Sequence, residues 1–121
     1  MSPDAFSNRL AISVTRPDGV VVVRAEGDVD LDNADQLTAA LRSADAEQDD
    51  AVVLDLTGVP FMDSSGLKVL LVALGELGER LTLAVGPGSP VETLLDLAEV
   101  RDRFSIHPTP EAAVRSRTED S

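Results

Sequence analysis

Two adjacent serines in the stretch FMDSSGLKVLL, residues 61–71, are the side chains best placed to take part in chemistry. Ser64 and Ser65 stand between Asp63 and Gly66, and a long apolar run follows them. A serine before such a run often caps a helix, because its hydroxyl accepts a hydrogen bond from a free backbone N–H group. A helix start also stabilises a phosphate group through its dipole and its free N–H groups. The pattern therefore predicts a cap, a phosphoacceptor, or both.

Lys68 favours the phosphoacceptor interpretation. It is the only charged side chain between Asp63 and Glu76, and it lies in the first turn of the expected helix, where a cation is unfavourable. A capping box is also missing, since neither Leu67 nor Lys68 is the Glu or Gln that would stand three residues after a capping serine. A lysine in this position becomes favourable when an anion occupies the helix start.

A catalytic role for either serine would need an activating base and an oxyanion hole. His107 is the only histidine, and it lies in SIHPTP, between an expected edge strand and the last expected helix. Nucleophile-elbow motifs such as GxSxG are absent from the sequence. We therefore predict that the chain is not an enzyme. The alternative, a small hydrolase that uses Ser64, requires His107 to lie close to Ser64.

The acidic segment EGDVDLDNAD, residues 26–35, contains candidate partner-binding residues. Asp28 and Asp30 end an expected strand, whereas Asp32 or Asn33 suits the cap of the following helix and Asp35 suits its first turn. The segment lacks the central glycine and the terminal Glu of a calcium-binding loop, and the chain has no cysteine. The glycines of VGPGSP are not accompanied by a phosphate-binding lysine. No metal and no cofactor are predicted.

The composition narrows the class of partner. The chain has 121 residues, the size of one domain, and a formal net charge of −12. Phosphate backbones and anionic lipid would repel such a chain, so neither nucleic acid nor a membrane is an expected partner. The N-terminal sequence MSPDAFSNRL has no apolar signal-peptide core, and no apolar run is long enough to span a membrane. A cytoplasmic protein that binds another protein is the default expectation.

Hydrophobic periodicity predicts one α/β domain at residues 10–115, with flexible ends at 1–9 and 116–121. The expected strands are 10–16, 20–27, 51–56, 81–85 and 103–106, and the expected helices lie within 28–47, 64–80, 90–100 and 109–117. The order is β-β-α-β-α-β-α-β-α. This order predicts a mixed, mostly parallel sheet of about four or five strands with about four helices.

The helix after the two serines is apolar nearly all round. Its leucines form one stripe expected to pack on the sheet: Leu67, Leu70, Leu71, Leu74 and Leu77. Val69, Val72 and Ala73 lie off that stripe, so we expect them, together with Met62, to contribute to a partner-binding surface. The loop 57–65 leaves the carboxyl end of the central strand, the edge of a parallel sheet where ligands and partners usually bind.

Three segments together resemble the STAS domain of bacterial anti-sigma factor antagonists: EGDVDLDNADQL, VVLDLTGVPFMDSSGLKVLL and VGPGSPVETLLDLAEVRDRFSIHPTPEAAV. The resemblance spans roughly residues 10–115 and is most specific at FMDSSGL and GDVD. It implies that Ser64, directly after Asp63, is a phosphoacceptor, with Ser65 and Gly66 completing the turn. It also implies that Asp30 contacts the kinase partner. Lys68 is a difference, since members often have a small residue there.

The resemblance implies a partner-switching protein. The unphosphorylated antagonist would bind an anti-sigma factor that is also a GHKL-type serine kinase, and would thereby release a sigma factor. Phosphorylation would end the binding, and a serine phosphatase would restore it. The alternative is a STAS subunit without a phosphoswitch, within a signalling assembly or a lipid-transport complex.

Overall fold

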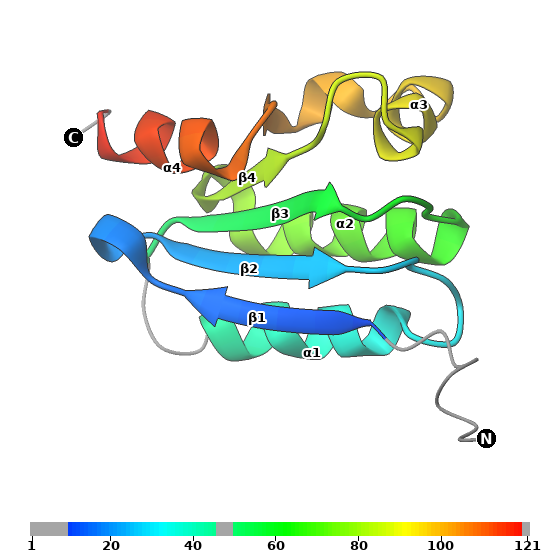
Figure 1. Ribbon diagram of the computed structural model, residues 1–121, viewed down its shortest axis with the longest axis horizontal. Coiled ribbons are helices and arrows are strands. Elements are labelled where there is room, and N and C mark those ends of the chain that lie inside the picture. Colours follow the sequence, from blue (N-terminus) through cyan, green and yellow to red (C-terminus); the bar gives the residue numbers. More distant parts are fainter. Residues whose placement is uncertain (1–9, 46–49, 120–121) are drawn as a thin grey trace.

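The computed structural model describes residues 10–45 and 50–119. Its elements follow the predicted order, a hairpin and then alternating helices and strands (Figure 1). The strands are β1 (Ala11–Thr15), β2 (Val21–Glu26), β3 (Val52–Gly58), β4 (Leu81–Ala84) and β5 (Ser105–His107). The helices are α1 (Ala34–Asp45), α2 (Ser64–Leu77), α3 (Pro90–Leu97) and α4 (Pro110–Thr118).

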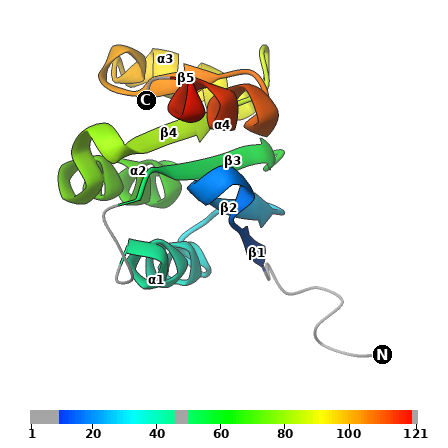
Figure 2. The same cartoon turned by 90° about the vertical axis from the view of Figure 1, so that its left-hand side faces the viewer.

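One sheet contains all five strands, in the order β1-β2-β3-β4-β5. β1 is antiparallel to β2 and the other neighbours are parallel, which confirms the predicted mixed sheet. α1 and α2 cover one face, here called the inner face, and α4 lies on the opposite, outer face (Figure 2). Within the described ranges, no helix combines the length and the apolar character needed to cross a membrane.

The central strand β3 is covered on both faces. Val52, Leu54 and Leu56 belong to the main core on the inner face, while Val53 packs with Ala113 of α4 in a smaller cluster on the outer face. A strand buried on both sides is nearly continuous in apolar residues, as the sequence of β3 is. Two polar residues interrupt β3: Thr57, which is exposed, and the acid Asp55, which is buried and was not singled out in the sequence.

The last two helices begin as their sequences predict. Pro90 and Pro110 occupy first helical positions, where a missing N–H group costs little. Thr109 Oγ1 accepts a hydrogen bond from Ala112 N at 3.1 Å and so caps α4. α4 continues to Thr118, into the segment 116–121 that the sequence assigned to a tail. Residues 1–9 and 120–121, which we also expected to be flexible, lie outside the described residues.

Thr82 on β4 carries a buried hydroxyl without a hydrogen-bond partner among the described residues. A buried hydroxyl in this state costs stability, because it has lost its hydrogen bonds to water. We expect Thr82→Val to raise the free energy of unfolding by about 1 kcal/mol, measured by urea denaturation. Thr82→Ser keeps the hydroxyl and loses the methyl group, so it should lower the stability. A destabilised valine variant would contradict the assignment.

Candidate phosphoacceptor site

The side chain that caps α2 is Asp63, not a serine. Asp63 Oδ1 accepts hydrogen bonds from Ser65 N at 2.8 Å and from Gly66 N at 3.3 Å. The sequence prediction that Ser64 or Ser65 would be the cap is therefore wrong. A carboxylate suits this role better, because it accepts two N–H groups at once and adds a negative charge at the positive end of the helix dipole.

Because Asp63 is the cap, the hydroxyl of Ser64 is left free. Ser64 is the first residue of α2, its side chain is exposed, and it has no hydrogen-bond partner among the described residues. Ser65 is half-buried. Two of the N–H groups that could neutralise a phosphate are already bound to Asp63. A phosphate on Ser64 would therefore point to solvent as unneutralised charge, apart from Lys68, which lies exposed one turn further along α2.

A short parallel bridge joins the loop after β2 to the loop before α2. Val29 pairs with Met62: Val29 N donates to Phe61 O at 2.9 Å, and Asp63 N donates to Val29 O at 3.1 Å. This bridge brings the segment that contains Asp28 and Asp30 alongside the start of α2. Asp28 and Asp30, the two acids that the sequence singled out, are therefore next to the first turn of α2. Asp28 is exposed and Asp30 is half-buried.

Asn33 holds the acidic segment in shape. Its side chain is 1% exposed; Nδ2 donates to Asp28 O at 2.8 Å, and Oδ1 accepts from Asp30 N at 2.9 Å. Asp30 Oδ1 in turn accepts from Asp32 N at 3.0 Å. The sequence reading considered Asn33 only as a helix cap. Its role as the internal brace of the loop depends on contacts that become visible in the folded chain.

Gly66 leaves no room for a side chain. A Cβ atom at this position would overlap Met62 Cγ and lie 2.9 Å from Val29 Cγ1. The first turn of α2 therefore rests directly on the bridge between Val29 and Met62. The sequence placed Gly66 in the turn without predicting this contact.

We expect Gly66→Ala to lower the free energy of unfolding by about 1–3 kcal/mol, because the added methyl group must displace Met62 or Val29 in a packed core. Gly75 is the matched control. It lies in the same helix with open space around its Cα, so Gly75→Ala should raise the stability by about 0.5–1 kcal/mol. Urea denaturation measures both. Equal effects of the two substitutions would contradict the close contact at Gly66.

The buried side of α2 differs from the predicted leucine stripe. Val69 and Ala73, expected at the surface, are 7% and 4% exposed, and Met62 is 4% exposed. These three residues are therefore too buried to form the partner-binding surface predicted from the sequence. Gly66 and Ala73 are small and let the helix lie close to the core, so the side of α2 that carries them is the buried one. Of the four apolar residues expected to contact a partner, Val72 keeps an exposed side chain, at 39%.

Two exposed apolar side chains near Ser64 were missed in the sequence. Leu31, next to Asp30, is 77% exposed, and Phe61, whose carbonyl accepts from Val29 N, is 50% exposed. Both lie in loops, outside any periodic pattern, so periodicity analysis passes over them. They could have been found in the sequence as large apolar residues in segments that are otherwise expected to be polar loops. We call Asp30, Leu31, Phe61, Ser64 and Lys68 the Ser64 surface.

His107 does not complete a catalytic arrangement with Ser64. It ends β5, which is separated from β3 by β4, and its backbone carbonyl accepts from Val85 N. Among the residues that the structure describes, no hydrogen bond joins the Ser64 and His107 side chains, and no group of three His, Asp or Glu side chains could hold a metal ion. Within the described part of the chain, His107 therefore offers Ser64 no activating base.

Comparison with known proteins agrees with this architecture. Residues 11–113 match the STAS domain. The chain is 32% identical to the anti-sigma-F factor antagonist RsfB of Mycobacterium tuberculosis, over 89% of this chain and 86% of the relative. It is 33% identical to an anti-sigma F factor antagonist of Paenibacillus polymyxa, over 91% of this chain and 94% of the relative.

A solved structure gives the same result for the fold. The crystal structure of an anti-sigma factor antagonist from Mycobacterium paratuberculosis superposes with a TM-score of 0.84 and 27% identity, covering 97% of each chain. Both the sequence match and the shared fold extend over nearly the whole molecule. This chain therefore belongs to the STAS domain family.

Proposed function

We propose that the chain is an anti-sigma factor antagonist that is switched by phosphorylation of Ser64. In the unphosphorylated state it binds an anti-sigma factor that is also a GHKL-type serine kinase, and the sigma factor is released in the cytoplasm. Phosphorylation of Ser64 ends this binding, and a serine phosphatase restores it. The observation that carries the proposal is the exposed Ser64 hydroxyl, which makes no hydrogen bond to the described residues and stands at a helix start whose cap is Asp63.

The charges around Ser64 explain how a phosphate would act. The group adds about −1.5 to −2 charges beside Asp63 and close to the loop of Asp28 and Asp30. The fold tolerates this charge, because the Ser64 side chain is at the surface and makes no hydrogen bond to the described residues. A partner that buries the Ser64 surface would have to remove the phosphate from water, which is costly without a matching cation. The phosphate therefore acts on binding rather than on folding.

The apolar part of the Ser64 surface supplies affinity. Leu31 and Phe61 are large and exposed, and burying such side chains against a partner contributes about 1.5–3 kcal/mol each. Val72 on α2 extends the same kind of contact. Asp28 and Asp30 complement a basic partner and speed its association. The chain itself is a regulatory, non-catalytic protein in this proposal, because the kinase supplies the chemistry.

The test begins with a tagged chain, used to isolate its partner in the presence of ADP. The recovered kinase is incubated with the chain and ATP, and the modified residue is mapped by mass spectrometry. We expect one phosphate on Ser64, none on Ser64→Ala, and unchanged modification of Ser65→Ala. A phosphate on another residue would refute the site. A tight partner that ATP does not release would instead support a STAS subunit without a phosphoswitch, in a signalling or lipid-transport assembly.

A further inference from the structure

A cleft of about 630 Å³ lies on the outer face of the sheet, away from the helices that carry the Ser64 surface. α4 contacts β3, β4 and β5 and packs with buried Val22 of β2, whereas Arg24 of β2 and most of β1 are exposed. Val22, Arg24 and Asp55 form part of the floor, and Pro110, Val114 and Arg115 of α4 form one wall. The volume is that of a small-molecule site. We call it the α4 cleft.

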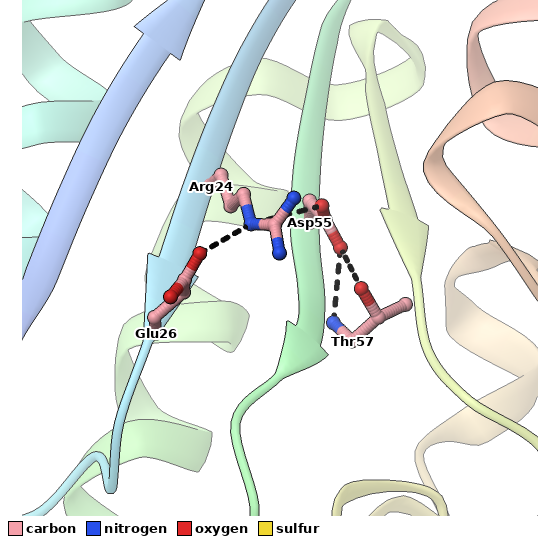
Figure 3. A network of polar contacts seen from close by, with 4 residues as sticks. All are labelled: Arg24, Glu26, Asp55 and Thr57. Atoms are coloured by element: carbon pink, nitrogen blue, oxygen red, sulfur yellow. Dashed lines mark hydrogen bonds and ion pairs between the residues drawn. The ribbon is translucent and has the colours of Figure 1, made fainter.

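Asp55 is a buried acid at the floor of the α4 cleft. Its side chain is 1% exposed, and its Oδ1 accepts hydrogen bonds from Thr57 N at 3.0 Å and from Thr57 Oγ1 at 2.6 Å (Figure 3). Its other oxygen, Oδ2, lies 4.0 Å from Arg24 Nε, which is beyond hydrogen-bond reach. Burying a carboxylate in this way costs stability. Among the described residues, Oδ2 accepts no hydrogen bond.

Arg24 stands beside Asp55 on the neighbouring strand, in direct register with it. Its Nε pairs with Glu26 Oε1 at 2.8 Å, and both of its ion pairs within the described ranges use that atom (Figure 3). The two terminal nitrogens of the guanidinium therefore remain for a ligand. A guanidinium presents them as a fork that matches a carboxylate. The cleft thus places a buried acid and an arginine side by side, with Asp55 Oδ2 and the terminal nitrogens of Arg24 making no hydrogen bond within the described ranges.

We propose that the α4 cleft binds a small zwitterion, an α-amino acid with an apolar side chain. Its ammonium group donates to Asp55 Oδ2, its carboxylate accepts from the terminal nitrogens of Arg24, and its side chain packs on Val22, Val114 and Pro110. Adjacent charges of opposite sign on the ligand match adjacent charges of opposite sign on the floor.

The charges that line the cleft also exclude other ligand classes. Three acids, Asp18, Asp55 and Glu111, outnumber the two arginines, Arg24 and Arg115. A phosphorylated or otherwise strongly anionic ligand would meet net repulsion there. A simple cation would leave the fork of Arg24 unused. A molecule that is neutral overall and carries both charges avoids both penalties.

The test titrates the full chain with L-leucine and follows its backbone amide signals by NMR. We expect saturable shifts at residues lining the cleft below about 10 mM ligand. N-acetyl-L-leucine lacks the ammonium group and L-leucine methyl ester lacks the carboxylate. Each should bind at least about tenfold more weakly, the effect of losing one charge-assisted hydrogen-bond pair. Absence of saturation, or a smaller loss for either derivative, would overturn the proposal.

A variant pair gives a second measurement. Arg24→Gln should weaken L-leucine binding at least about tenfold. Arg42→Gln removes an arginine on α1 whose ion pair with Glu76 lies on the inner side, so it should bind as the unsubstituted chain does. An Arg24→Gln chain that binds L-leucine normally would also overturn the proposal. Phosphorylation of Ser64 is not involved in either measurement, so the two proposals fail or stand separately.

Discussion

Ser64→Asp is expected to weaken the complex with the anti-sigma factor kinase at least about tenfold, whereas Ser64→Ala retains the affinity of the unsubstituted chain. The aspartate places a negative charge beside Asp63, in a surface whose burial also covers Leu31 and Phe61. Desolvation of that charge opposes the complex. Isothermal titration calorimetry without ATP measures all three affinities at one salt concentration.

The control for Ser64→Asp is the stability of the free chain. Because the Ser64 side chain is exposed and has no hydrogen-bond partner among the described residues, the thermal midpoints of the alanine and aspartate variants should match the unsubstituted chain. Aspartate carries about half the charge of phosphoserine, so the chain phosphorylated on Ser64 should bind more weakly still. Undiminished binding by that phosphorylated chain would contradict the switch.

Asn33→Ala is expected to lower the free energy of unfolding by about 2–3 kcal/mol. The substitution removes a buried side chain that makes two hydrogen bonds to the backbone, at Asp28 O and Asp30 N. Both backbone groups then lose their partner in a part-buried loop, which costs more than the average hydrogen bond contributes. Urea denaturation with a fixed slope measures the change.

The same substitution tests how the acidic loop contributes to binding. If Asn33 positions Asp30 for the kinase, Asn33→Ala should also weaken the complex at temperatures where the variant is fully folded. Gln36→Ala, an exposed change in the first turn of α1, is the matched control and should alter the stability by no more than about 0.5 kcal/mol. An Asn33→Ala chain as stable as this control would show that the loop does not depend on the two hydrogen bonds.

The order of elements could be predicted from the sequence because each element carries its own local pattern. β3 is nearly continuous in apolar residues, and Pro110 after Thr109 marks the start of α4. Such signals depend on the backbone and on residues nearby in sequence, so they can be recognised without knowledge of the fold. The position of Ser64 at the start of a helix was predictable for the same reason.

The assignment of the cap and of the contact surface was not predictable in this way. Asp63 and Ser64 both suit a cap, and the pairing of Val29 with Met62 sets the chain direction that makes Asp63 the cap. The buried side of α2 is likewise set by how closely Gly66 and Ala73 let the helix approach its neighbours. Both depend on residues that are distant in sequence.

By itself, the sequence determined the α/β order, the mixed sheet, the start of α2 and the presence there of a serine beside an acid, because these follow from local periodicity and turn chemistry. The tertiary structure alone decided which hydroxyl is free, which apolar residues are exposed, and that Arg24 and Asp55 meet at the floor of a cleft. Those properties arise when β2 pairs with β3 and when α4 covers one part of the outer face and not another. Each of these properties depends on how two segments that are distant in sequence pack together, so neither segment alone reveals it.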